Sequence, residues 1–95
     1  MRSYVDVGTV AGIKGINGRL VVRRTSGLPF FLSEGTVLFA VPPKIDIERR
    51  LVVDDAVEHD SKFEVSLKDM HDPGIANEYI GCHLLVDSSE VPEDV

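Results

Sequence analysis

The segment GTVAGIKGINGR, residues 8–19, spaces glycines at positions 8, 12, 15 and 18 among apolar residues. The residues around its start, YVDVGTVAG, alternate in character, which predicts a strand from Tyr4 to about Gly12. The residues at its end, GRLVVRR, predict a second strand. Between them, Asn17 followed by Gly18 favours positive φ and is among the strongest hairpin signals. The segment therefore predicts the tip of a β-hairpin.

The same glycines are reminiscent of phosphate-binding motifs, but their context fits none of them. A P-loop ends in GK followed by Ser or Thr, whereas Lys14 precedes its glycine. A dinucleotide fingerprint opens a helix, and this segment opens a strand. GIKG matches the GxxG of KH domains in letters only, because that loop joins two helices. Backbone geometry is the favoured explanation, since glycines let a barrel corner close without side-chain clashes.

The hairpin also carries cations that are suited to an RNA backbone. Exposed amides at the tip, flanked by lysine and arginine, favour contact with phosphates. Arg23 and Arg24 face opposite sides of a strand, so at most one of them shares a face with Arg19. The alternative, a merely solvated strand end, stays open. The candidate contact residues are Lys14, Gly15, Asn17, Arg19, Arg23 and Arg24.

Charge is distributed unevenly along the chain. The net charge is −6, yet residues 1–50 carry eight Lys and Arg against four Asp and Glu, whereas residues 51–95 carry two against twelve. An acidic chain of this kind can present a local basic patch to nucleic acid, because the local field sets contact preference. The acidic half predicts a negatively charged surface that could bind a basic ribosomal protein. Its candidate residues are Asp54, Asp55, Glu58 and Asp60.

The rest of the chain predicts an all-β domain. β-branched residues favour strands over Thr36–Val41, which Pro42-Pro43 ends, and over Ile47–Glu58, Phe63–Lys68 and residues 82–87. Arg49 and Arg50 are candidates for a turn or bulge. Ninety-five residues support one hydrophobic core. Five or six strands joined by short turns predict a small closed or nearly closed antiparallel barrel.

Three further segments complete this prediction. Asp72 is expected to cap a short helix that Gly81 ends, with Ile75, Tyr79 and Ile80 sharing one face. The apolar residues around Pro29 predict a plug in the barrel mouth, with a binding knob as the alternative: Leu28, Phe30, Phe31 and Leu32. The polar segment SSEVPEDV predicts a linker or tail.

The sequence gives no support for a catalytic site, a metal site or a membrane-spanning segment. The histidines lack metal-ligand spacing, and Cys82 and His83, as neighbours on a strand, point to opposite faces. Cys82 is expected to be a buried structural thiol, and as the single cysteine it fits a reducing cytoplasm. No apolar run approaches the roughly 20 residues that span a bilayer. We expect no cofactor, no metal and no enzymatic activity.

The order of these features resembles the amino-terminal domain of the ribosome maturation factor RimM family. The resemblance rests on VGTVAGIKGINGRLVVRR, then LPFFLSEG, then ANEYIGCHLLVDSSEVP, and covers about residues 4–92. Family members often have His-Gly where this chain has Lys14-Gly15, so a titratable ring is replaced by a permanent cation. The segment PPKIDIERR matches no family pattern closely.

The resemblance implies a six-stranded antiparallel barrel of the translation-factor type with one short helix before the last strand. It implies a cytoplasmic, non-catalytic assembly factor that helps the head of the small ribosomal subunit and its 16S rRNA mature. Its partners would be the small subunit, its rRNA and its ribosomal protein numbered nineteen. On this basis residues 1–88 form the barrel domain of a monomer. Residues 89–95 begin a linker to a PRC-type barrel that this chain lacks.

Overall fold

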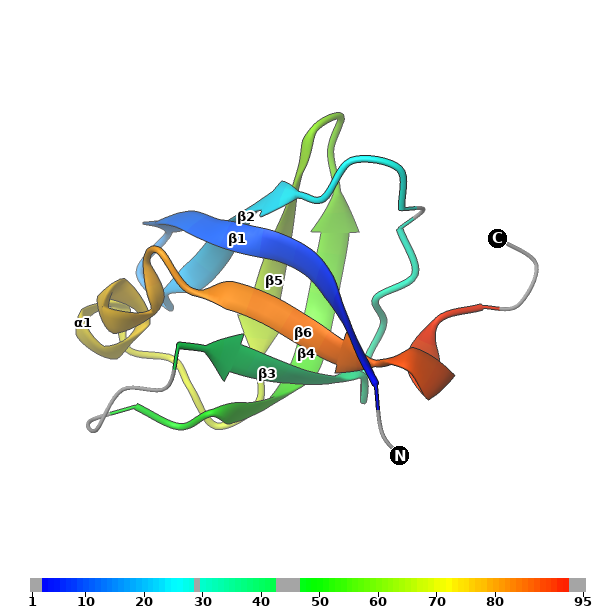
Figure 1. Ribbon diagram of the computed structural model, residues 1–95. Coiled ribbons are helices and arrows are strands. Elements are labelled where there is room, and N and C mark those ends of the chain that lie inside the picture. The colour runs from blue at the N-terminus through cyan, green and yellow to red at the C-terminus, as the bar shows by residue number, and fades with distance from the viewer. Residues whose placement is uncertain (1–2, 29, 43–46, 93–95) are drawn as a thin grey trace.

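The computed structural model describes residues 3–28, 30–42 and 47–92. Six strands run through them: β1 (Tyr4–Lys14), β2 (Arg19–Arg24), β3 (Val37–Val41), β4 (Arg50–Glu58), β5 (Lys62–Leu67) and β6 (His83–Asp87). They pair antiparallel and close into a barrel in the order β1-β2-β5-β4-β3-β6 (Figure 1). The predicted all-β, six-stranded antiparallel barrel is confirmed.

The core lies inside this barrel, where alternate residues of every strand point inward. On β2, Leu20 and Val22 are fully buried, and on β5 the buried residues are Phe63, Val65 and Leu67. The plug segment packs against the same core, with Leu32 buried and the rings of Phe30 and Phe63 5.6 Å apart. The predicted packing of Leu28, Phe30, Phe31 and Leu32 is therefore confirmed; Pro29 lies outside the described residues.

β1 has a register shift against each of its two neighbours, β2 and β6. Its register shifts between Asp6 and Gly8 against β6, and between Val10 and Gly12 against β2, as β-bulges do. A Cβ atom on Gly8 would lie 2.5 Å from both the carbonyl oxygen of Arg23 and Cγ1 of Val22. Gly8 therefore allows the close approach that was predicted for a barrel corner.

The hairpin is confirmed, with a longer first strand and therefore a shorter turn than predicted. β1 continues past Gly12 to Lys14, which pairs with Arg19. The loop is thus GING, in which Gly15 and Gly18 adopt φ of 80° and 71°. Asn17 does not take the positive φ that its sequence favours, because the loop has four residues and places its left-handed conformations at both ends.

The segment between β5 and β6 is helical, as predicted, but its buried face differs. Helix α1 (Pro73–Ala76) passes directly into a 3₁₀ turn, η1 (Asn77–Tyr79), and the Asp72 carboxylate caps α1 by accepting from Gly74 N at 2.8 Å. In a 3₁₀ turn residues three apart align, so Ala76 and Tyr79 point inward. The predicted shared face was wrong, since Ile75 and Ile80 are 46 % and 39 % exposed.

Several strand limits also differ from prediction. β3 begins at Val37 and β5 spans Lys62–Leu67, each displaced by one residue. β4 begins only at Arg50, because residues 47–49 bend, which places the suspected turn at Arg49 before the strand. Pro42 follows β3 directly; Pro43 lies outside the described residues.

After β6 the chain forms a 3₁₀ turn, η2 (Ser88–Glu90), at the barrel end opposite α1 (Figure 1). Val91 is partly buried against the core, so packed structure extends three residues beyond position 88. No helix in the described ranges is long and apolar enough to cross a membrane.

Candidate nucleic-acid interface

The predicted contact residues do not form one cluster, because they occupy both ends of the first hairpin. Lys14 and Arg19 face each other where β1 and β2 meet the turn, and Gly15 and Asn17 are exposed within it. The turn also holds Ile16, which is 87 % exposed. The remaining two candidates, Arg23 and Arg24, lie at the far end of β2, about 15 Å away at the usual rise of a strand.

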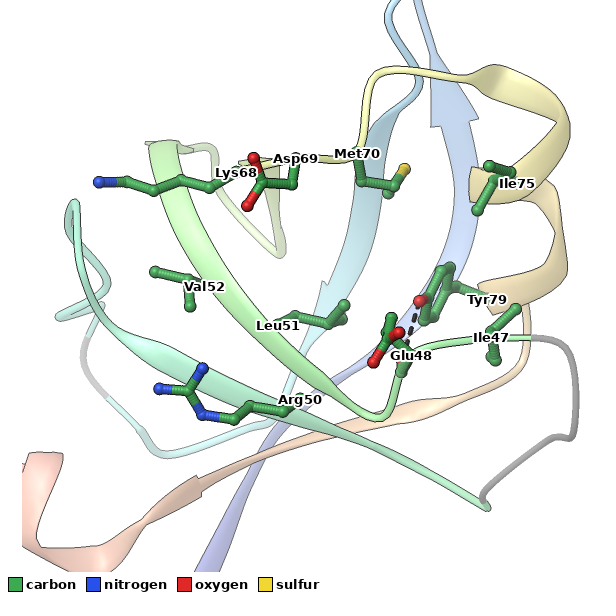
Figure 2. Close-up of a pocket in the computed structure, with 10 residues that line it drawn as sticks. All are labelled: Ile47, Glu48, Arg50, Leu51, Val52, Lys68, Asp69, Met70, Ile75 and Tyr79. Atoms are coloured by element: carbon green, nitrogen blue, oxygen red, sulfur yellow. Dashed lines mark hydrogen bonds between the residues drawn. The ribbon is translucent and has the colours of Figure 1, made fainter.

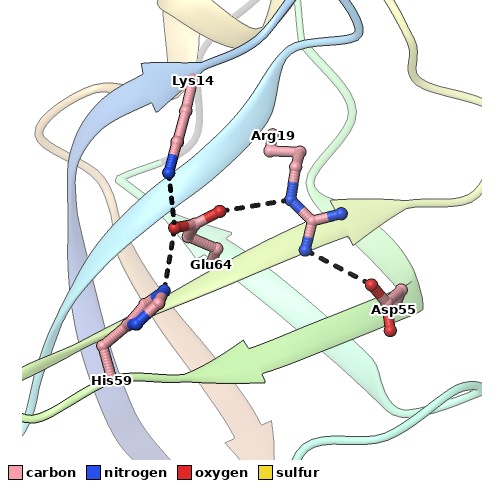
Figure 3. A network of polar contacts seen from close by, with 5 residues as sticks. All are labelled: Lys14, Arg19, Asp55, His59 and Glu64. Carbon is pink, nitrogen blue, oxygen red and sulfur yellow. Dashed lines mark hydrogen bonds and ion pairs between the residues drawn. The ribbon is translucent and has the colours of Figure 1, made fainter.

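The two cations near the turn are paired with carboxylates from β4 and β5. Lys14 Nζ lies 3.3 Å from Glu64 Oε2, and Arg19 Nε lies 3.4 Å from Glu64 Oε1. Arg19 also lies 3.3 Å from Asp55, and His59 Nε2 lies 2.9 Å from Glu64 (Figure 3). Folding has placed the acidic half of the chain beside the basic half, so these cations are locally neutralised.

Glu64 is the centre of this network. Its side chain is only 14 % exposed, although it lies on the outer face of β5. Burial acts to raise the pKa of Glu64, but hydrogen bonds from His59 and Lys14, together with the charges of both, outweigh it. The pKa of this carboxyl therefore lies below its usual value, and it is ionised near neutral pH.

Arg24 is engaged in a different way at the other end of β2. Its guanidinium lies 2.7 Å from the Glu58 carboxylate and also donates to the carbonyl oxygens of Leu28 and Asp60. Its side chain is 20 % exposed. Arg24 thus ties the plug segment to the β4–β5 turn, which is a structural role.

Arg23 differs from these three cations, because it is exposed and has no carboxylate partner within the described ranges. Its neighbour across the sheet is Lys62, which sequence reasoning missed. Only the register of β2 against β5 brings these residues together, and no short-range sequence pattern encodes that register.

A separate hollow of about 700 Å³ lies beside β4 and α1 (Figure 2). Leu51, Met70 and Tyr79 contribute its apolar lining, with Arg50 and Lys68 among its charged residues. The Tyr79 hydroxyl donates to the carbonyl oxygen of Glu48 at 2.8 Å, and burial raises the pKa of Tyr79. The Tyr79 hydroxyl is therefore engaged with the backbone at Glu48.

A metal site requires several ligating side chains close together. No group of three or more His, Cys, Asp and Glu side chains there is placed to hold a metal ion. Cys82 is a buried free thiol, as predicted, and His83 is exposed on the next position. His83 Nδ1 instead lies 2.9 Å from the Asp6 carboxylate.

Comparison with known proteins decides the family. The model of the RimM N-terminal domain matches residues 5–91, nearly the whole chain. The chain belongs to the RimM family. The fold agrees with that of a protein described as a 16S ribosomal RNA processing protein RimM from Pseudomonas aeruginosa, with a TM-score of 0.66 at 18 % identity. That likeness covers 95 % of this chain and 54 % of the Pseudomonas protein, so the chain spans about half of that RimM protein's length.

Proposed function

We propose that this domain is a non-catalytic factor in maturation of the small ribosomal subunit and processing of its 16S rRNA. The observation that carries the proposal is the RimM N-terminal domain match over residues 5–91, on a closed barrel of the expected topology.

The partners proposed for it are the immature small subunit, its rRNA and its ribosomal protein numbered nineteen, in the cytoplasm, with the domain acting as a monomer. We also propose that the domain acts next to a PRC-type barrel, joined by a linker that begins after Val91, which still packs against the core. The length of the Pseudomonas RimM protein, of which the match covers 54 %, supports this arrangement.

A second candidate function is a protein-only adaptor that meets a basic ribosomal protein through its acidic half. The ion pairs favour it in one respect, because Lys14, Arg19 and Arg24 are already neutralised by acids. The same pairs engage Asp55 and Glu58, two of the four acids that such an adaptor would use.

Co-sedimentation of the purified chain with immature and mature small subunits tests the proposal. We expect preferential binding to the immature particles. Absence of binding to immature particles at low salt would overturn the assembly role.

Binding of the same chain to naked 16S rRNA across a potassium chloride series separates the two candidates. Phosphate contacts give a linear fall in the logarithm of affinity with the logarithm of salt concentration. Binding to immature subunits with no affinity for naked rRNA would favour the protein-only adaptor instead.

A further inference from the structure

Arg23 on β2 and Lys62 on β5 are directly opposed in the sheet. Cβ atoms of such cross-strand partners lie about 5 Å apart on the same face. Both side chains are exposed. Like charges in this position destabilise a sheet, so the fold itself gains nothing from this pair.

The pair stands out because neighbouring cations of the same hairpin are neutralised. Lys14, Arg19 and Arg24 each lie within 3.4 Å of a carboxylate. Neither Arg23 nor Lys62 has such a partner in the part of the chain that the structure describes.

The acid on the same face of β5 does not compensate the pair. Glu64 is two residues from Lys62 on the same face of β5, but Lys14, Arg19 and His59 already occupy its oxygens. The backbone of His59 donates to the carbonyl of Lys62 at 2.9 Å, while its ring turns to Glu64.

Polar groups continue from the pair across the next two strands. Thr9 on β1 is the partner of Arg23 on the other side, and His83 on β6 is the partner of Thr9. Thr9 Oγ1 lies 3.2 Å from His83 Nδ1, and the Asp6 carboxylate lies 2.9 Å from the same nitrogen. The Asp6 carboxylate thus contacts His83, two strands away from Arg23, and does not neutralise the Arg23 guanidinium.

We propose that Arg23 and Lys62 bind a phosphodiester of an RNA backbone that crosses the outer face of β2 and β5. This assignment rests on the proposed function and places the contact on the sheet instead of the hairpin tip. A guanidinium binds two phosphate oxygens at once, and an ammonium adds a mobile point charge. Contacts of this kind position RNA without reading its sequence.

The test is Lys62→Glu in the full chain, with naked 16S rRNA as the probe. The new carboxylate opposes Arg23, so both phosphate contacts are lost together. We expect affinity to fall on the order of tenfold. The logarithmic salt slope should fall by about 0.7 in magnitude, the value for one neutralised phosphate on a single strand. The same change removes the repulsion, so Tm should rise by roughly 1–5 °C.

Lys68→Glu is the matched control, because it makes the same change of charge at an exposed lysine that Glu34 already pairs at 3.3 Å. We expect rRNA affinity within twofold of the unsubstituted chain. An equal loss of rRNA affinity in both variants would mean that binding depends only on overall charge. That result would overturn the proposed contact at Arg23 and Lys62. An unchanged affinity in Lys62→Glu, with normal binding by the unsubstituted chain, overturns the site and leaves the proposed function standing. If the unsubstituted chain binds neither naked rRNA nor immature subunits, the proposed function itself fails.

Discussion

Glu64 accepts a hydrogen bond from Lys14 at 3.3 Å, although the two residues are fifty positions apart in the chain. The contact joins the basic first hairpin to β5 in the acidic second half. Arg19 and His59 approach the same carboxylate. This single acid therefore explains why the two cations beside the hairpin turn, Lys14 and Arg19, do not form an open basic patch.

Replacing Glu64 by Gln is expected to lower the free energy of unfolding at pH 7 by about 1 kcal/mol, because charge-assisted bonds to Lys14 and Arg19 are weakened. The pKa of Glu64 is lowered in the folded state, so its contribution is complete above the usual value of 4.5. It is lost as pH falls through the lower folded pKa. Urea unfolding from pH 7 to pH 3 should show the two proteins converging in acid. If the difference in the free energy of unfolding between the two proteins stayed constant over this pH range, the proposed stabilisation by the ionised Glu64 would be contradicted.

Gly8→Ala is expected to lower the free energy of unfolding by roughly 1–3 kcal/mol, because its Cβ would collide with the backbone of Arg23 and the side chain of Val22. Gly12→Ala is the matched control, since nothing lies within 4 Å of a Cβ placed there. Alanine at position 12 should leave stability unchanged or raise it slightly. Thermal unfolding of both variants measures the difference in their stability. An equal loss of stability in the two variants would exclude a steric role for Gly8.

Tyr79→Phe should lower the free energy of unfolding by about 1 kcal/mol, because the Glu48 carbonyl loses its hydrogen-bond donor. Tyr4→Phe offers the comparison within the same chain. Tyr4 is 45 % exposed, and its ring packs edge-on against Phe39 at 5.5 Å, a contact that phenylalanine keeps. We expect a change within about 0.5 kcal/mol for Tyr4→Phe. Denaturant titration distinguishes the two, and a larger effect at position 4 would show that the hydroxyl of Tyr79 contributes little.

Asp72→Ala should lower the free energy of unfolding by about 1 kcal/mol, through loss of the cap on α1. Asp72→Asn keeps a side-chain oxygen and should retain most of the stability. Amide hydrogen exchange at Gly74 provides the local readout, since its amide donates to this side chain. Equal exchange rates in the alanine and asparagine variants would argue against capping.

The fold was largely predictable because its signals are local. Alternation of apolar and polar residues marks strands, glycine pairs mark turns, and Asp72-Pro73 marks a helix start, each within a few residues. Two features were not predicted, and their causes are visible only in the three-dimensional structure. The turn after α1 tightened to a 3₁₀ turn, which buried Tyr79 and left Ile80 exposed. Val91 packs against the core although the surrounding sequence is polar.

The sequence by itself determined the strand content, the first hairpin and the family, since these depend on short-range patterns and their order. Only the tertiary structure decided which cations are neutralised. Charge balance at a surface depends on strand register, and register joins residues far apart in the chain. It placed Glu64 beside Lys14, and it placed Lys62, which pairs with no acid among the described residues, opposite Arg23.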